Sequence, residues 1–198
     1  MGGNYLGNAG HFLIETLFGL YILTVMLRFL LQLVRADFYN PVSQFLVKVT
    51  NPPLIPLRKI IPGIGGIDWA SVLLMFGLKL GELVLRGLLP KSSIPPMPGI
   101  FVIASAGLLS LLVNVFLFSI LIQVVISWIS PGGYNPMVGL LQQLTEPLLR
   151  PARRLIPPIS GLDLSPMAVI IVLYLILMLV VQPIHDLGVH MAFYATPQ

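Results

Sequence analysis

The sequence has no cysteine and very few charged residues, and these two shortages exclude several classes of protein. Without cysteine there is neither a disulfide framework nor a thiolate metal site. Only 9% of the 198 residues are charged and 57% are apolar, whereas roughly 25% are charged in a typical soluble domain. A soluble chain of this size could not bury so much apolar surface, so the composition indicates an α-helical integral membrane protein.

The sequence also lacks the motifs of the common enzyme classes. It contains no Walker loop, no H-E-x-x-H, no G-x-S-x-G turn and no Gly-rich dinucleotide turn after a strand. The histidines are too few and too scattered for a metal site; they are His11, His185 and His190. We therefore predict no enzymatic activity, no cofactor and no metal. The net charge of +4 is expected to report membrane topology rather than nucleic-acid binding.

Four apolar segments are long enough to cross a bilayer. A spanning helix needs about 20 mostly apolar residues, because the hydrocarbon core is about 30 Å thick and an α-helix rises about 1.5 Å per residue. The predicted spans are residues 11–35, 69–89, 100–129 and 165–184, the last ending near Pro183. The prolines and glycine of residues 90–99 disfavour a helix, so this segment is the predicted connector between two halves.

The two halves are copies of each other. At an offset of 95 residues, 39–68 align with 134–163 without gaps, and 14 of the 30 positions are identical. The flanking apolar segments keep the same register. The sequence therefore predicts an all-α membrane protein with four transmembrane helices, made of two parallel two-helix repeats over 1–98 and 99–198. A pseudo-two-fold axis along the membrane normal would relate the repeats.

Each duplicated segment predicts a short amphipathic helix, with a capping asparagine and a proline at its start and a further proline at its end. These residues are Asn40, Pro41 and Pro52 in the first copy and Asn135, Pro136 and Pro147 in the second. The apolar stripe is Val42, Phe45, Leu46 and Val49 in the first copy and Met137, Leu140, Leu141 and Leu144 in the second. Such a stripe would face either the acyl chains at the membrane interface or the transmembrane bundle.

Two basic residues and one aspartate follow each amphipathic helix at matching positions. They are Arg58, Lys59 and Asp68 in the first copy and Arg153, Arg154 and Asp163 in the second. The basic residues would either bind anionic lipid headgroups or only fix topology. Each aspartate directly precedes a span, so we expect an N-cap, with a catalytic or ion-binding role as the alternative.

Basic residues gather in the two repeat loops, and this bias predicts the orientation. They are Lys48, Arg58 and Lys59 in the first loop and Arg150, Arg153 and Arg154 in the second. The first ten residues and the tail after Pro183 contain no lysine or arginine. The positive-inside rule therefore places both repeat loops in the cytoplasm and both termini on the other side of the membrane.

The second span has charged residues on one helical face, namely Lys79, Glu82 and Arg86. An ionisable group in the bilayer costs roughly 3 kcal/mol or more unless it is paired. The fourth span is uncharged at the matching positions, so this face belongs to one repeat only. It would form an ion or proton path, or else a structural ion pair or the contact surface of an oligomer. Arg28 and its counterpart Gln123 place one polar group at the same depth of the first and third spans.

The duplicated pattern Y-N-P followed by T-x-P-x-L-x-P, two basic residues and a closing aspartate resembles the YggT family of small membrane proteins. The resemblance covers nearly the whole chain, and two tandem copies match the proteobacterial form. The first copy departs from the second with Asn51 in place of Glu146 and with an extra proline, Pro53. The resemblance implies the inner membrane of a bacterium, with periplasmic termini.

The resemblance implies two possible functions. Bacterial family members are connected with osmotic tolerance and potassium uptake, and single-copy relatives with cell division, nucleoid arrangement and thylakoid protein assembly. The first function is a non-enzymatic envelope-organising or assembly factor that acts on lipids or proteins through its cytoplasmic amphipathic loops. The second is an osmotic-stress or potassium-uptake transport component, which would need a homo-oligomer or membrane protein partners. The expected contacts are the lipid bilayer, including anionic lipids, and no nucleic acid.

Overall fold

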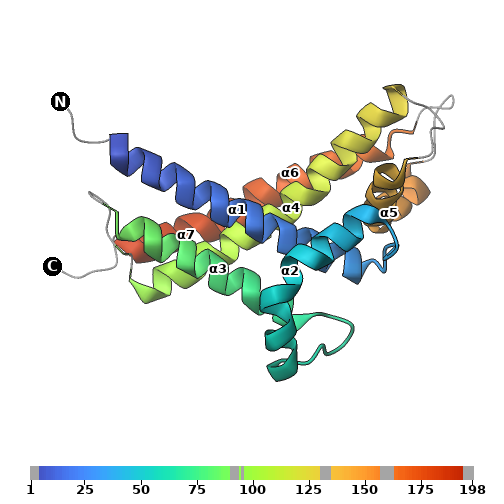
Figure 1. Cartoon of the computed structure of the whole chain (residues 1–198). Helices are drawn as coiled ribbons and strands as arrows, with labels where there is room; N and C mark the ends of the chain where they lie inside the picture. The colour runs from blue at the N-terminus through green and yellow to red at the C-terminus, as the bar shows by residue number, and fades with distance from the viewer. Residues whose placement is uncertain (1–4, 90–93, 95, 130–134, 157–162, 194–198) are drawn as a thin grey trace.

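The computed structural model describes residues 5–89, 94, 96–129, 135–156 and 163–193, which are mostly helical (Figure 1). The helices are α1 (Tyr5–Leu33), α2 (Pro41–Ile60), α3 (Trp69–Gly87), α4 (Met97–Ile129), α5 (Pro136–Leu155), α6 (Ser165–Ile176) and α7 (Gln182–Phe193). A π-helical turn, Leu177–Val181, joins α6 to α7 without a break. For the described residues, the predicted all-helical fold is confirmed.

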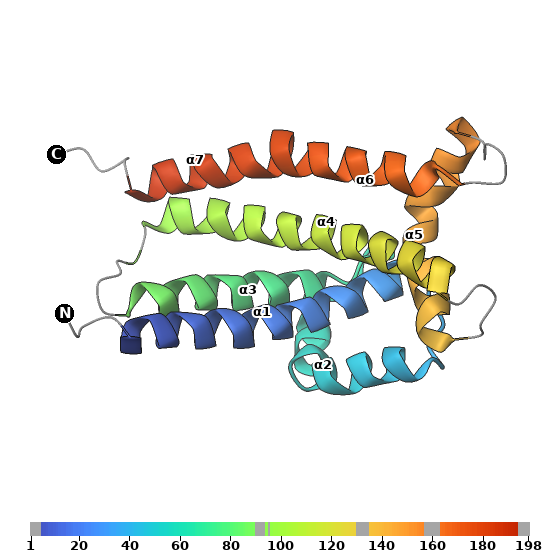
Figure 2. The same cartoon turned by 90° about the horizontal axis from the view of Figure 1, so that it is seen from above.

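The long helical segments form two pairs, α1 with α3 and α4 with α6–α7, and the two pairs cross each other (Figure 1 and Figure 2). α1 and α4 run in one direction, while α3 and the continuous α6–α7 segment run back. α1 packs against α3, α4 packs against α7, and contacts between α3 and α4 join the two pairs. The start of α1 and the end of α7 lie at one end of the bundle, and α5 and the start of α2 lie at the other, which we call the loop end (Figure 2).

Three helical segments are long and apolar enough to cross a membrane: α1, α4 and the continuous helix Ser165–Ala192. α3 coincides with the predicted span 69–89, but it has only 19 residues and includes the three charged ones. By length and composition the structure thus supports three spans. α4 begins inside the connector predicted over 90–99, because Pro98 lies in the first turn, where a missing N–H needs no partner.

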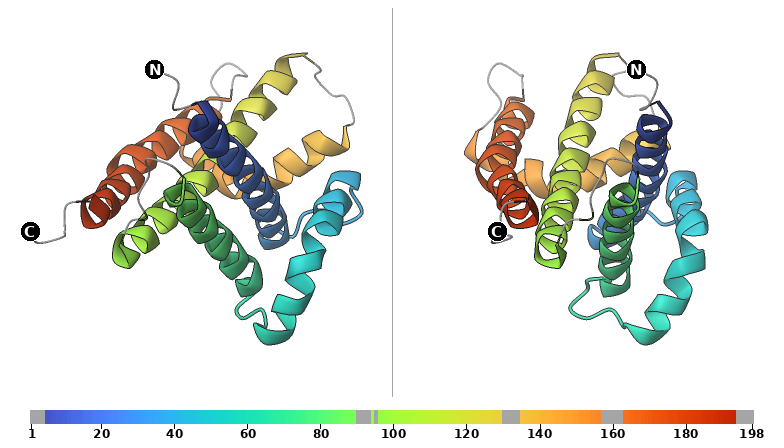
Figure 3. Two further views of the ribbon diagram at one scale, coloured as in Figure 1. Left: turned by 60° about the vertical axis from the view of Figure 1, so that its left-hand side comes forward. Right: turned by 90° about the vertical axis from the view of Figure 1, so that its left-hand side faces the viewer.

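The prediction that Pro52 and Pro147 end the loop helices is wrong. α2 continues to Ile60 and α5 continues to Leu155, with prolines inside both helices. A proline removes one donor, and its ring clashes with the carbonyl four residues earlier, so the helix bends. Figure 3 shows the bend of α2. Polar side chains of the preceding long helices form hydrogen bonds near both bends, and this support allows each helix to continue.

The prediction that the last span ends near Pro183 is also wrong. The helix that begins at Ser165 runs through Pro183 to Phe193. Just before this proline the turn is π-helical, and the N–H of Gln182 donates to the carbonyl of Leu177 five residues earlier. The wider turn accommodates a ring that would clash with a carbonyl in a regular α-helix. The resulting extension, α7, packs along α4.

α4 and α7 approach each other closely at two glycines. A Cβ added to Gly99 would lie 2.6 Å from the Cβ of Ala192, and one added to Gly188 would lie 2.9 Å from the backbone nitrogen of Ile103. Helices in membranes often use small residues to bring their backbones together. Because glycine has no side chain, these two residues allow the short distance between α4 and α7.

Two clusters of buried apolar residues hold the bundle together. The first is centred on α1 and also contains Leu46 from α2 and both Leu140 and Leu144 from α5. The second contains Ile120 from α4, Leu149 from α5 and residues of α6. Because α5 contributes to both clusters, the loop helix of the second repeat packs on the first repeat as well as on its own.

Candidate functional site at the loop end of the bundle

The two loop helices begin with the same capping geometry. The Oδ1 atom of Asn40 accepts a hydrogen bond from the N–H of Val42 over 2.9 Å, and that of Asn135 accepts from Met137 over 2.9 Å. A proline occupies the start of each helix. The caps satisfy N–H groups that have no partner within the helix. Both predicted asparagine N-caps are confirmed.

The two loops are also bonded to each other. The Nδ2 atom of Asn40 donates to the carbonyl of Pro136 over 2.7 Å, and the N–H of Asp37 donates to the Oε1 atom of Gln143 over 2.8 Å. α5 contacts both α2 and α1. Asn40 thus caps its own helix and at the same time holds the other repeat, so the loop end is one connected structure.

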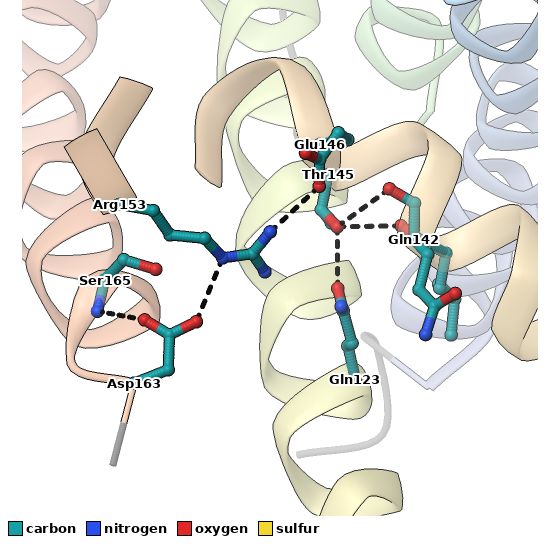
Figure 4. Close-up of polar contacts among 8 residues, drawn as sticks. Gln123, Gln142, Thr145, Glu146, Arg153, Asp163 and Ser165 are labelled. Carbon is teal, nitrogen blue, oxygen red and sulfur yellow. Dashed lines mark hydrogen bonds and ion pairs between the residues drawn. The ribbon is translucent and has the colours of Figure 1, made fainter. Parts of the chain in front are cut away.

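A buried threonine near each helix bend contacts a polar side chain of the preceding long helix. In the first copy, Arg28 Nη1 donates to Thr50 Oγ1 over 2.6 Å, and Thr50 donates to the carbonyl of Leu46. In the second copy, Thr145 Oγ1 donates to the Oε1 atom of Gln123 over 2.6 Å (Figure 4). Arg28 and Gln123 are repeat counterparts, as are the two threonines. Each pair therefore fixes a bent loop helix to its long helix.

An ion pair closes each loop. Arg58 pairs with Asp68 in the first copy, and Arg153 pairs with Asp163 over 3.0 Å in the second. Arg153 also lies 3.0 Å from Glu146, a carboxylate that the first copy lacks (Figure 4). The ion pairs tie the last part of α2 to the start of α3, and the last part of α5 to the segment before α6.

These contacts favour the ionised form of both aspartates. Burial opposes ionisation, but hydrogen bonds from its arginine partner and from Ser71 lower the pKa of Asp68. The pKa of Asp163 is lowered in the same way by Ser165 and its arginine partner. Because the pKa values are lower in the folded protein than in the unfolded chain, the contacts stabilise the fold above the ordinary aspartate pKa. This contribution is lost as the pH falls through the folded pKa.

Each aspartate meets the predicted N-cap role only in part, because Asp163 lies one residue before Leu164, the N-cap residue of α6. Asp163 accepts from the N–H of Ser165, at the start of α6, over 2.9 Å. Asp68 occupies the N-cap position of α3, and its carboxylate is bound mainly by side chains. Its Oδ2 atom accepts from Arg58 and from the hydroxyl of Ser71. Asp68 thus has the predicted N-cap position, while two side-chain donors occupy its carboxylate.

The apolar stripes of the loop helices are divided between the core and the surface. Leu46, Leu140 and Leu144 are buried in the first cluster. Phe45 is 62% exposed and Met137 is 48% exposed. The two environments that the sequence left open, the bundle and the outer surface, thus occur together in each helix.

The basic residues of the loops fall into two groups. Arg58 and Arg153 are held by carboxylates. The second group is exposed and has no ion pair within the part of the chain that the structure describes. It consists of Lys48 and Lys59 on α2 and Arg150 and Arg154 on α5. The second group is therefore the one available to lipid headgroups or a partner protein.

The charged face predicted on the second span lies between helices and is paired. Glu82 is 1% exposed, and its carboxylate lies 2.7 Å from Lys79 Nζ and 3.4 Å from Arg86 Nη1. Arg86 also lies 3.7 Å from Glu15 of α1. A Cβ added to Gly107 of α4 would lie 3.0 Å from the Cε atom of Lys79, so the lysine stem packs against α4. Two cations and two carboxylates form a network without net charge.

Several of these polar contacts could not be assigned from the sequence. Thr50 and Thr145 are identical positions of the two copies, two residues before a proline, and that identity was the available signal for a shared role. Ser71 has no such signal, because its counterpart is a proline. The bond from Asn40 to Pro136 joins residues 96 positions apart, and no local pattern predicts it.

Comparison with known proteins agrees with the duplicated geometry. The model of the CCB3/YggT family matches the chain twice, over residues 7–89 and 102–184. The chain belongs to this family. The first match covers most of α1 and all of α2 and α3. The second covers most of α4, all of α5 and α6, and the π-helical turn. The chain therefore contains two tandem family repeats. Most of α7 lies beyond the second match.

Similar proteins of the family occur in several bacteria. The chain is 46% identical over 191 residues to an uncharacterized protein of Pseudomonas aeruginosa. The alignment covers 89% of this chain and 90% of that protein. It is 39% identical over 180 residues to the uncharacterized protein YggT of Escherichia coli, covering 89% and 92%. No solved structure matches the chain. These names describe no activity, so the family is established and the function is not.

Proposed function

We propose that this chain is a non-enzymatic protein of the bacterial inner membrane that organises lipids or partner proteins through α2 and α5 at the cytoplasmic face. The observation that carries the proposal is the joined loop end, where exposed apolar residues adjoin unpaired basic residues. Each basic residue near a membrane attracts anionic headgroups by about 1 kcal/mol. Exposed apolar side chains of an amphipathic helix enter the acyl boundary or contact a partner helix.

In this proposal all four long segments cross the membrane, including α3. Its 19 residues correspond to roughly 29 Å at about 1.5 Å per residue, which is close to the thickness of the hydrocarbon core. Its charged residues pair within the bundle, and pairing removes the main penalty for placing them there. The two repeats are then parallel, and the exposed basic residues place the loop end in the cytoplasm and the termini in the periplasm.

The charge network on α3 supports a structural role rather than ion transport. The carboxylate of Glu82 already has two cations within 3.4 Å. A passing cation would have to displace Lys79 or Arg86 before it could bind there. The role in organising the envelope is therefore the better supported of the two functions.

Substituting Phe45 by glutamate should weaken surface contacts without unfolding the protein. Phe45 is 62% exposed, so Phe45→Glu should accumulate normally in the membrane. Its carboxylate would repel anionic headgroups and interrupt an apolar contact. The amounts of lipid and protein that copurify in mild detergent should therefore fall severalfold. Mass spectrometry of the copurified material measures the loss.

Leu6→Glu is the matched control, since Leu6 is 90% exposed and lies on α1 at the opposite end of the bundle. It should retain the lipids and proteins that the wild type retains. Identical copurified material from the wild type and from Phe45→Glu would contradict the proposed function.

A further inference from the structure

A cavity of about 390 Å³ lies between the C-terminal end of α1, the turn that follows and α2. One part of its lining is polar and cationic, and consists of Arg28, Gln32, Arg35, Ser43 and Arg58. The rest is lined by leucine, valine, alanine and phenylalanine side chains of α1, α2 and the connecting turn. A ligand that fills this cavity would therefore combine an anionic group with an apolar part.

The polar part of the cavity has donors that the protein leaves unused. Ser43 is only 5% exposed, and its hydroxyl has no hydrogen-bond partner in the described part of the chain. Arg28 uses Nη1 for its bonds to Thr50 and to the carbonyl of Val47, and no bond is formed by its Nε or Nη2 within the described residues. Buried polar groups normally have partners, so the Ser43 hydroxyl indicates that a ligand supplies one, and the unused N–H groups of Arg28 are available to the same ligand.

The cavity also carries unbalanced positive charge. Of its three arginines, Arg58 is paired with Asp68. Arg28 and Arg35 form no ion pair within 4 Å among the residues that the structure describes, and the carboxylate that acts on Arg28, Asp68, is already bound by Arg58. Arg28 is 7% exposed, so its charge is largely removed from water, and such a charge is unfavourable without a counter-ion. The planar guanidinium group suits a phosphate, to which it can donate two parallel hydrogen bonds.

The second repeat lacks the donors that distinguish this cavity. Arg28 corresponds to Gln123 and Ser43 corresponds to Val138. The counterpart of Arg58 is neutralised by two carboxylates. The two loops share the caps, threonines and ion pairs that form their common fold, and they differ at residues that line the cavity. This difference indicates a function of the first repeat that the common fold does not require.

We propose that the cavity binds a phosphate group, with Arg28, Arg35 and Ser43 as its donors. The apolar part of the lining receives the hydrocarbon portion of the same ligand. The headgroup region of an anionic phospholipid has both features, whereas free phosphate has only the first. The inference rests on the proposed function for the side of the membrane that the cavity faces, and it adds a ligand chemistry to that surface.

Binding to the full-length protein in nanodiscs of phosphatidylcholine tests the inference, because choline balances the phosphate charge of that lipid and an anionic lipid should displace it from the cationic cavity. Added phosphatidylglycerol should occupy a saturable site, detected by native mass spectrometry and by a rise in the thermal midpoint. Arg28→Gln and Ser43→Val introduce the residues of the second repeat. Arg28→Gln should weaken binding about tenfold or more, and the double variant about a hundredfold. Ser43→Val alone should have an effect of a few-fold.

Two controls separate the loss of the site from unfolding and from loss of charge. Glutamine at position 28 can bond Thr50 as Gln123 bonds Thr145, so the thermal midpoint in pure phosphatidylcholine should change little. Lys59→Gln removes one exposed charge of the same loop outside the cavity, and it should weaken binding by a few-fold at most. Equal phosphatidylglycerol binding by the wild type and by the double variant of residues 28 and 43 would overturn the inference.

Inorganic phosphate distinguishes the two sources of the ligand. If it raises the midpoint in neutral discs and Arg28→Gln abolishes the effect, the site takes free phosphate. If only phosphatidylglycerol does so, the site takes the lipid headgroup. If neither phosphatidylglycerol nor inorganic phosphate binds in the cavity, the copurification test of Phe45→Glu can still support the proposed function. Conversely, failure of that test leaves binding to the discs unaffected, so the two proposals can be rejected separately.

Discussion

Replacing Glu82 alone by leucine should prevent the protein from accumulating in the membrane, whereas replacing Lys79, Glu82 and Arg86 together by leucine should not. Glu82 is 1% exposed and is the carboxylate that both cations share. The single change leaves Lys79 without any ion-pair partner inside the bundle. Breaking a buried pair in this way costs about 3–5 kcal/mol, a large part of a typical stability of about 5–15 kcal/mol. The triple change produces an apolar helix instead.

The amount of protein in the membrane fraction and the thermal midpoint in detergent measure this difference. Glu15→Leu is the matched control, because it removes a carboxylate of the same network that is 64% exposed and 3.7 Å from Arg86. Its effect should stay below about 1 kcal/mol, as for other exposed pairs. Growth under osmotic stress then separates the two functions. A triple variant that accumulates normally and supports growth agrees with a structural network, whereas one that accumulates but fails would favour a transport component.

Replacing Gly99 or Gly188 by alanine should destabilise the protein, although alanine has a higher helix propensity than glycine. The new Cβ at Gly99 would lie 2.7 Å from the backbone nitrogen and Cα of Ala192, and the one at Gly188 would lie 2.9 Å from the backbone nitrogen of Ile103. No rotamer change can relieve a clash with backbone, so α4 and α7 must separate. We expect a loss of about 1–3 kcal/mol for each variant, as for other overpacked sites.

Gly77→Ala is the control, and its effect on stability should have the opposite sign. Gly77 lies within α3, and nothing is within 4 Å of the added Cβ. Helix propensity should therefore stabilise this variant by up to about 1 kcal/mol. Thermal midpoints of the three variants in the same detergent make the comparison. A midpoint for Gly99→Ala equal to or above that of the wild type would show that the close approach of α4 and α7 does not limit stability.

The long helices, the duplication and the asparagine caps could be predicted because they depend on local sequence. Apolar runs determine where α1 and α4 lie, and the offset of 95 residues pairs Asn40 with Asn135. Pairing within α3 could be expected as well, since Lys79 and Glu82 are three residues apart on one helical face. Each of these inferences uses residues that are close in the chain or related by the repeat.

The bends could not be predicted, because they depend on contacts between separate helices. A proline usually ends a helix, yet α2 continues past Pro52, beside the bond between Arg28 and Thr50. The helix of the fourth span continues past Pro183 because a π-helical turn precedes it, and hydropathy does not reveal such a turn. The ion pair of Asp68 could not be predicted for a similar reason, since its partner Arg58 lies on the bent α2. Tertiary contacts thus override the local preference in each case.

Labelling of single cysteines tests the central claim that α2 and α5 lie at the cytoplasmic face of the membrane. The native sequence has no cysteine, so each introduced thiol is unique. Lys59→Cys and Arg154→Cys occupy matched, exposed positions of the two loops, and Leu6→Cys lies at the opposite end of the bundle. A membrane-impermeant maleimide should label position 6 in intact spheroplasts, and positions 59 and 154 only after permeabilisation. Labelling of position 59 or 154 in intact spheroplasts would contradict the account.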